Sequence, residues 1–254
     1  MLTIRNLEKD YGGFPVLERV TLDIKDGCFC GIVGPSGCGK STFLRILLGQ
    51  EAPSRGELLL DGVPLPNEPS TERGIVFQRY SVFPHLTARE NLLLAHDFEG
   101  SPFLARAFGA RRQEAERMAD QLLDRTGLDP ARDRYPAQLS GGMQQRLAIA
   151  QALMKRPRML LLDEPFGALD PGVRLEMHDL LLELWREHGM TIFMVTHDIS
   201  EAFKLSTRVL TFDKVRSDPQ FPDAYGATVT YDLSVDGTAF PDNIVKDDPN
   251  AELG

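Results

Sequence analysis

The sequence predicts an α/β fold. In it a parallel sheet is covered by helices on both faces and is joined by an N-terminal antiparallel β subdomain and an inserted helical subdomain. Short, continuously apolar strands alternate with helical segments, a pattern typical of parallel sheets buried on both faces. Residues 86–157, by contrast, contain no convincing strand. The 254 residues are 42% hydrophobic and 26% charged, which excludes wholesale disorder, collagen-like repeats and coiled coil.

Hydrophobic patterns place six elements in the first 77 residues. Alternation of apolar and polar residues, as in Val20-Thr21-Leu22-Asp23-Ile24, predicts half-buried strands. A continuous apolar run followed by a Gly-rich loop predicts a buried strand that leads into an apolar helix. The expected strands are residues 2–7, 16–24, 29–33, 56–60 and 74–77, and the expected helix is residues 41–49.

Two later apolar runs, residues 159–162 and 191–195, predict further buried strands, each preceded by a helical segment. The helical stretch between them and the N-terminal elements begins with Thr87-Ala88-Arg89-Glu90, a capping-box pattern that opens a helix. A second helix is expected over about 113–126, ending at Gly127.

The net charge of −9 is unevenly distributed, because residues 216–254 hold eight acidic and two basic residues and carry −6. An acidic chain is poorly suited to wrapping phosphate backbones, so no nucleic-acid partner is expected. Alternation over 229–235 predicts an edge strand in this tail. The expected organisation is a domain of residues 1–215, with its helical subdomain at about 86–157, and an acidic tail of residues 216–254.

The cysteines Cys28, Cys30 and Cys38 are an odd set within eleven positions, which suits neither a disulfide framework nor a zinc site. Cys28 and Cys30 are interpreted as small strand residues. The N-terminus lacks a signal-peptide pattern, and no stretch approaches the roughly 18 apolar residues of a membrane span. These features predict a soluble, cytoplasmic chain.

Residues Gly34–Ser41 read Gly-Pro-Ser-Gly-Cys-Gly-Lys-Ser and match the phosphate-loop pattern G-x-x-x-x-G-K-[ST]. Glycines let backbone N–H groups point inward around phosphate oxygens, and the following helix adds the positive end of its dipole. Lys40 would neutralise the β- and γ-phosphates, and the Ser41 hydroxyl would bind Mg²⁺. The loop predicts a P-loop NTPase core and by itself leaves kinases, GTPases and ATPases open.

The apolar strand 159–162 ends in two carboxylates, Asp163 and Glu164. Successive strand residues point to opposite sides, so Asp163 is expected to face Mg²⁺ and Glu164 to polarise the water that attacks the γ-phosphate. His197 follows the next apolar strand, at the end of the sheet where α/β proteins bind ligands, which favours a catalytic role.

The sequence Leu139-Ser140-Gly141-Gly142-Met143-Gln144-Gln145-Arg146 stands about 20 residues before the carboxylate strand. With it, residues 1 to about 215 resemble the ATP-binding cassette (ABC) proteins, whose signature sequence it matches. The resemblance implies that Tyr11 stacks on adenine, that Gln78 contacts Mg²⁺ or water and faces the transporter, and that His197 contacts the γ-phosphate. It implies four catalytic residues (Lys40, Gln78, Glu164 and His197) and three Mg²⁺ ligands (Ser41, Gln78 and Asp163). The implied ATP-binding residues are Tyr11, Gly34, Pro35, Ser36, Gly37, Cys38, Gly39, Lys40, Ser41, Thr42, Gln78, Ser140, Gly141, Gly142, Asp163 and, in the D-loop, Asp170.

The signature departs from the commonest family sequence at its fifth position, where Met143 replaces Gln. Importer cassettes that resemble the nitrate, sulfonate and taurine group often have this Met. The Ser-Gly-Gly turn would open a helix with an apolar stripe, and the free N–H groups at its start form an anion site. The stripe is Met143, Leu147, Ala150 and Met154.

In ABC proteins two cassettes dimerise head to tail, and each ATP lies between one phosphate loop and the partner's signature. Since the sequence has one of each, the resemblance implies a homodimer or a pair with a homologous cassette. It also implies the ATPase subunit of an importer on the cytoplasmic face of the inner membrane, for a nitrate/sulfonate/taurine-like or urea/guanidine-like solute. Permease subunits would dock near Gln78 and residues 79–84, and an extracytoplasmic solute-binding protein would be an indirect partner.

The alternative functions are a soluble ABC ATPase, an exporter cassette and a non-hydrolysing regulator. A soluble ABC ATPase of DNA repair or translation usually has two cassettes or a long coiled-coil insertion, and exporter cassettes are often fused to membrane spans. A non-hydrolysing regulator is opposed by the joint presence of Lys40, Asp163, Glu164 and His197.

Cys38 lies within the phosphate loop. The helix start is expected to lower the pKa of its thiol, so that alkylation inactivates the enzyme and ATP protects it.

Overall fold

The computed structural model describes residues 1–77, 82–97, 110–216 and 224–235. The chain forms two compact units, one of residues 1–69 and 182–254 and the other of residues 70–181. The segment 86–157, expected as a helical subdomain, lies within the second unit, which also contains two strands.

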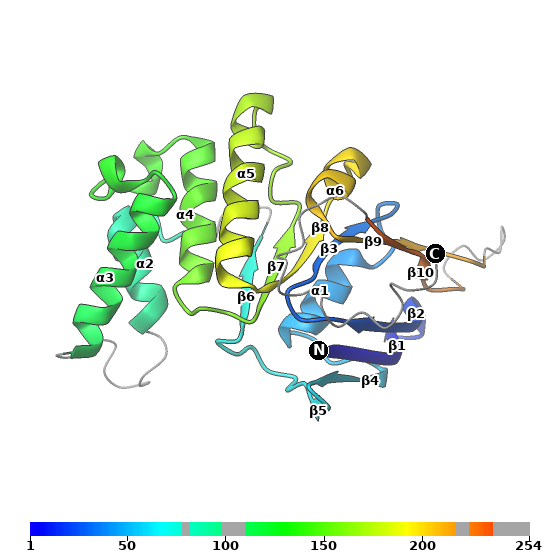
Figure 1. The fold of residues 1–254 in the computed structure, drawn as a ribbon. Coiled ribbons are helices and arrows are strands. Elements are labelled where there is room, and N and C mark those ends of the chain that lie inside the picture. The colour runs from blue at the N-terminus through cyan, green and yellow to red at the C-terminus, as the bar shows by residue number, and fades with distance from the viewer. Residues whose placement is uncertain (78–81, 98–109, 217–223, 236–254) are drawn as a thin grey trace, which may run out of the picture. The chain divides into compact units, whose positions relative to one another are not determined.

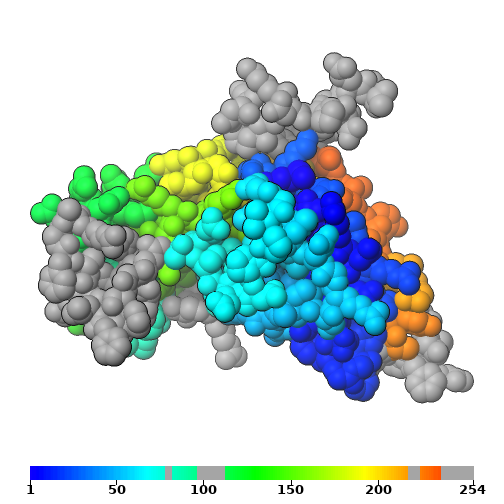
Figure 2. Space-filling model, turned by 90° about the horizontal axis from the view of Figure 1, so that it is seen from below, coloured from blue at the N-terminus to red at the C-terminus, as the bar shows by residue number. Residues whose placement is uncertain are grey.

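The first unit contains an antiparallel sheet built from N-terminal residues (Figure 1). The strands follow the order β2-β1-β4-β5, and apolar residues of β1 such as Leu2, Ile4 and Leu7 are buried. Gly12 and Gly13 have positive φ angles of 62° and 91° and connect β1 to β2. In Figure 2, N-terminal residues, in blue to light blue, lie on the face that is seen from below. The bounds are β1 (Leu2–Tyr11), β2 (Phe14–Ile24), β4 (Arg55–Leu60) and β5 (Val63–Pro64).

The other strands of the first unit follow the order β10-β9-β3-β8. They are β3 (Phe29–Val33), β8 (Thr191–Val195), β9 (Arg208–Asp213) and β10 (Thr228–Ser234). β3 pairs in parallel with both β8 and β9, whereas β10 pairs antiparallel with β9 at the edge. The tail therefore contributes an edge strand where the alternating pattern predicts one.

Helices cover both faces of these strands (Figure 1). On one face, α1 (Lys40–Leu48) inserts Phe43, whose ring centroid lies 6.3 Å from that of Phe193. Phe193 is in register with Cys30, so both side chains lie on the same face of the sheet. Gly31, the residue after Cys30, faces the opposite side. On that other face lies α6 (Ile199–Leu205), where a Cβ on Gly31 would contact Ala202 at 3.2 Å. The expected covering of both faces is confirmed.

The second unit pairs β6 (Arg73–Val76) in parallel with β7 (Met159–Asp163) and contains the helices between them. These are α2 (Ala88–Asp97), α3 (Ala110–Arg125), α4 (Gly141–Leu153) and two short 3-10 turns, Asp129–Ala131 and Pro136–Gln138. The long helix α5 (Pro171–His188) begins in this unit, and its residues from 182 onward belong to the first.

The predicted helix signals of the second unit are confirmed. Thr87 and Glu90 form the expected capping box, with the Glu90 N–H donating to Thr87 Oγ1 at 3.2 Å and the Thr87 N–H donating to Glu90 Oε2 at 2.8 Å. Helix α3 starts three residues earlier than expected and ends before Gly127, whose φ is +67°. Among the described helices, none combines the length and apolar character that crossing a membrane requires.

Candidate functional site

The phosphate loop follows β3 and ends at α1, in the first unit. Gly34 has a φ of 147°, and a Cβ at this position would overlap the carbonyl oxygen of Phe212. Gly39, the N-cap of α1, has a φ of 84°, and a Cβ there would lie 2.7 Å from Leu17 Cδ2. Both positions thus need glycine for their backbone angle and for space. The loop runs directly into the N-terminus of α1, as the motif predicts.

Lys40 is buried at the start of α1 and turns its ammonium back onto the loop. Its Nζ donates to the carbonyl oxygens of Gly34 at 2.7 Å and Pro35 at 2.8 Å. These two acceptors are neutral, and a buried ammonium can gain by exchanging neutral acceptors for anionic oxygens. The arrangement suits binding of a phosphate group.

The structure corrects the expectation for Cys38. Its side chain is buried, with 4% exposed, and lies 3.7 Å from the Lys40 ammonium. Burial raises the pKa of the Cys38 thiol and outweighs the lowering by Lys40, because an apolar surrounding disfavours the thiolate. The prediction of a lowered pKa is therefore wrong, whereas inactivation by alkylation stays a prediction whose premise the structure does not support.

Cys28 and Cys30 are also buried and free, with their Sγ atoms 3.4 Å apart. Cys30 lies in β3 and Cys28 directly precedes the strand, which agrees with their interpretation as small strand residues. Within the described residues, no cluster of three or more His, Cys, Asp or Glu side chains is placed to hold a metal ion.

Tyr11 lies at the end of β1 with 43% of its surface exposed. Its hydroxyl donates to the carboxylate of Glu51, and the Lys9 ammonium lies 4.9 Å from its ring centroid. Desolvation and the neighbouring Glu51 carboxylate raise the pKa of the Tyr11 phenol, which therefore stays neutral. The sequence does not suggest the contact with Glu51, which stands 40 positions away.

The carboxylates Asp163 and Glu164 stand where β7 ends, in the second unit. Asp163 is the last strand residue, and Glu164 adopts a left-handed backbone with a φ of +48°. Such a conformation is uncommon for a residue other than glycine and occurs often at functional sites. The strand thus ends at Asp163, and the chain turns at Glu164.

The signature sequence opens α4 as predicted. Ser140 is the N-cap, and its Oγ accepts the N–H of Met143 at 3.3 Å. A Cβ on Gly142 would overlap Cγ1 of Val173, so only glycine allows the start of α4 to approach α5 this closely. Of the predicted apolar stripe, Leu147, Ala150 and Met154 are buried and Met143 is half-buried.

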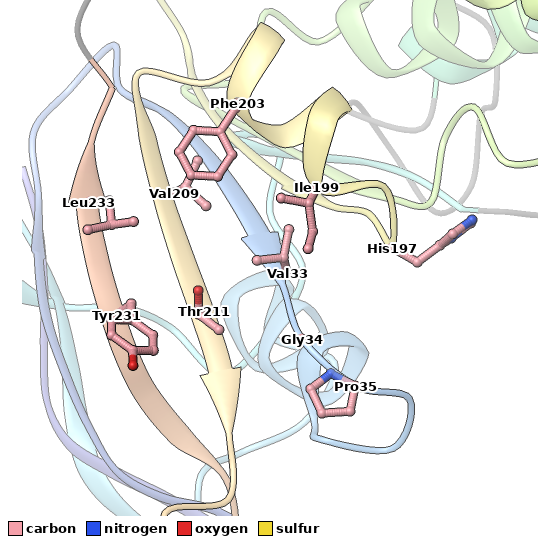
Figure 3. Close-up of a pocket in the computed structure, with 10 residues that line it drawn as sticks. All are labelled: Val33, Gly34, Pro35, His197, Ile199, Phe203, Val209, Thr211, Tyr231 and Leu233. Carbon is pink, nitrogen blue, oxygen red and sulfur yellow. The ribbon is translucent and has the colours of Figure 1, made fainter.

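His197 follows β8 and is exposed at the rim of an apolar groove of about 520 Å³ (Figure 3). Its loop is held by the preceding Thr196, whose hydroxyl donates to Glu201 at 2.6 Å, and by Asp198, which caps α6. The groove lies between α6 and the strands β3, β9 and β10. Its lining is Val33, Gly34, Pro35, His197, Ile199, Phe203, Val209, Thr211, Tyr231 and Leu233.

Asp170 and Gln78 are the predicted residues of the D-loop and of the loop that faces the transporter. Asp170 is exposed directly before α5, and its carbonyl oxygen accepts the N–H of Arg174 at 2.9 Å. Gln78 and residues 79–81 lie outside the described residues.

A comparison with known protein families matches residues 17–167 to the ABC transporter family. The chain belongs to that family. The glutamine transport ATP-binding protein GlnQ of Escherichia coli is 42% identical over 223 residues, covering 85% of this chain and 89% of GlnQ. The bicarbonate transport ATP-binding protein CmpD of Synechocystis is 42% identical over 215 residues, covering 82% of this chain and 73% of CmpD.

The fold agrees with that of a solved cassette. The dimeric post-hydrolysis state of the ATP-binding cassette MJ0796, bound to ADP and Pi, has a TM-score of 0.73 and 32% sequence identity. The match covers 94% of this chain and 100% of that one. This ABC protein is thus an ATP-binding cassette with ATPase activity, on the P-loop NTPase fold that the sequence predicts.

Proposed function

We propose that this ABC cassette is the ATP-hydrolysing subunit of an importer for a small solute. The observation that carries the proposal is the buried Lys40 ammonium, held at 2.7 and 2.8 Å by two loop carbonyls that phosphate oxygens can replace. The similarity to GlnQ and CmpD, both named for transport, supports the link to a transporter.

In this proposal the backbone N–H groups of the loop and Lys40 bind the phosphates of ATP, and the exposed ring of Tyr11 stacks on adenine. The hydroxyl of Ser41, the carboxylate of Asp163 and the side-chain carbonyl of Gln78 are oxygen donors of the kind that Mg²⁺ prefers. Mg²⁺ would neutralise charge on the β- and γ-phosphates. Glu164 accepts a proton from the attacking water, and His197 contacts the γ-phosphate.

A second chain is needed to complete each site. The chain has one phosphate loop and one Ser140-capped signature helix, whose first N–H groups form an anion site. We therefore propose a head-to-tail pair, as a homodimer or with a homologous cassette. The dimeric state of MJ0796 with ADP and Pi supports this pairing.

We further propose that the pair works on the cytoplasmic face of the inner membrane, bound to permease subunits. An extracytoplasmic solute-binding protein would deliver the solute to these subunits. Closure of the dimer on ATP would shift the permease between its two states, by preferential binding of ATP to the closed form. The relatives act in transport of different solutes, so the nitrate/sulfonate/taurine-like and urea/guanidine-like classes both stay proposals. Uptake assays with the permease encoded beside this chain would decide between them.

Hydrolysis tests the proposal directly. Replacing Glu164 by Gln should leave ATP binding intact and lower turnover by at least about 100-fold, because the amide cannot accept the proton of the attacking water. Glu176→Gln is a matched control, since Glu176 pairs with Arg146 at 2.6 Å on the surface of the same unit. Undiminished turnover in Glu164→Gln would contradict the assigned role, and the soluble, transporter-free ABC ATPase would be favoured if no permease copurified.

A further inference from the structure

One carboxylate, that of Glu51, connects the adenine-side aromatic residue to two cations. Its Oε2 accepts the hydroxyl of Tyr11 and lies 3.6 Å from Lys9 Nζ, and its Oε1 lies 3.0 Å from Arg45 Nη1. The Glu51 and Lys9 side chains are only 19% and 14% exposed. Such partly desolvated pairs are screened less by water and salt than pairs on the open surface.

The same contacts fix the ring of Tyr11. Its hydroxyl is held at one end by Glu51, and the Lys9 ammonium lies 4.9 Å from the ring centroid. Lys9 is itself anchored, because its Nζ also donates to the carbonyl oxygen of Ala52 at 2.8 Å. The ring is thus restrained at its hydroxyl and through its contact with a cation, while 43% of the residue stays exposed.

Arg45 extends this network to the phosphate loop. Its Nε donates to the carbonyl oxygen of Ser41 at 3.3 Å, and its Nη2 donates to Thr42 Oγ1 at 3.4 Å. Ser41, the last residue of the loop motif, and Thr42 belong to the first turn of α1. Glu51 therefore links the residue proposed to contact the base with the turn proposed to contact the phosphates.

We propose that Glu51 is a positioning residue for the adenine base. It holds the Tyr11 ring at a fixed place relative to the phosphate loop, so that the ring need not be ordered when ATP binds. Fixing a side chain in advance raises affinity by removing that ordering cost from binding. The inference rests on the proposed stacking of Tyr11 on adenine and deepens it.

Variants of Glu51 and Tyr11 test this inference through the ATPase reaction of the full chain. Glu51→Ala should raise KM for ATP by about 5-fold, by loss of this ordering, with kcat within about twofold of wild type. Glu51→Gln, which keeps an acceptor for the Tyr11 hydroxyl but loses the negative charge, should give a smaller rise. Tyr11→Phe should raise KM too, and its effect should not add fully to that of Glu51→Ala, because both variants lose the hydrogen bond between these two side chains.

Tripolyphosphate is the probe that separates positioning of the base from damage to the loop. It contains the phosphates of ATP without adenine, so its inhibition constant should be the same in wild type and Glu51→Ala. Glu57→Ala is the matched control, because Glu57 is paired with Arg5 at 3.4 Å in the same antiparallel sheet. It should change neither constant.

The outcomes distinguish a failure of the role of Glu51 from a failure of the proposed stacking of Tyr11 on adenine. If Tyr11→Ala raises KM for ATP while Glu51→Ala and Glu51→Gln do not, the role of Glu51 is overturned and stacking by Tyr11 stands. If Tyr11→Ala leaves KM unchanged, stacking itself is overturned, and the role of Glu51 with it. A weaker binding of tripolyphosphate to both Glu51 variants would make Glu51 a structural support of the loop and would also overturn the inference.

Discussion

The side chain of Asn91 binds the backbone of Phe83 in both directions. The Phe83 N–H donates to Asn91 Oδ1 at 2.7 Å, and Asn91 Nδ2 donates to the Phe83 carbonyl oxygen at 3.1 Å. The same Nδ2 also lies within bonding distance of the carbonyl oxygens of Leu86 and Thr87. Because Asn91 is fully buried in α2, its amide fixes the loop that leads into this helix. That loop contains the last residues of the segment 79–84, which we propose to meet the permease.

Asn91→Ala should therefore loosen this loop. The Phe83 N–H and the Leu86 carbonyl oxygen would lose the hydrogen bonds that Asn91 provides, while the carbonyl oxygens of Phe83 and Thr87 would keep the N–H groups of Leu86 and residue 91. The free energy of unfolding should fall by about 1–3 kcal/mol. Urea denaturation measures this loss. In the assembled transporter, uptake should fall more than ATP hydrolysis does, and an equal fall in both would contradict a role of the loop in coupling.

A smaller side chain at position 173 should rescue the loss of stability that a larger side chain at Gly142 causes. Gly142→Ala places a methyl group where Val173 Cγ1 lies and should cost about 1–3 kcal/mol, because the start of α4 must shift. Adding Val173→Ala removes that atom and should restore much of the thermal stability. If the double variant melted at the same temperature as Gly142→Ala, this overlap would not be the cause.

Asp120 should stabilise the second unit in a pH-dependent way. Its carboxylate accepts from Arg89 Nε at 2.9 Å and from Arg132, and the hydrogen bond with Arg89 holds its pKa below the ordinary 3.8. Because this pKa is lower in the folded than in the unfolded protein, the carboxylate stabilises the fold fully at pH values above the unfolded-state pKa. The stabilisation is lost as the pH falls through the folded-state pKa.

Asp120→Asn should thus cost about 0.5–1 kcal/mol at pH 7, a modest amount because the Asp120 side chain is 43% exposed. The difference between the two proteins should shrink below about pH 4. Thermal melts across this pH range measure it, and a difference independent of pH would speak against the ion pair.

Cys38 should react slowly with iodoacetamide at pH 7 in the folded protein. Burial raises its pKa and blocks access, so little thiolate is available. Peptide mass spectrometry after labelling, with a urea-unfolded sample as the control, measures the protection. Rapid labelling of Cys38 with loss of ATPase activity would restore the expectation that the structure overturned.

Local patterns were enough to predict the strands of residues 29–33 and 191–195, whose apolar runs coincide with β3 and β8. The alternating tail pattern likewise indicated an edge strand where β10 lies. β9 was not predicted, since its six residues, Arg-Val-Leu-Thr-Phe-Asp, are identified as a strand by their pairing with β3 and β10 more than by their own pattern.

The site shows the same division. Sequence spacing singled out the phosphate loop, the carboxylates after β7 and the N-cap Ser140, because each lies in one short segment. It could not predict the pKa of Cys38, which depends on how deeply the folded chain buries the side chain. Nor could it predict the bond of Tyr11 to Glu51, which joins positions 40 residues apart.

The mass of Glu164→Gln in solution tests the central claim most directly. With saturating ATP and Mg²⁺, light scattering should report two chains of 28.3 kDa each, and Lys40→Ala in the same buffer should stay at one. If Glu164→Gln bound ATP at every protein concentration yet kept the mass of a single chain, a nucleotide shared between two copies of this chain would be contradicted.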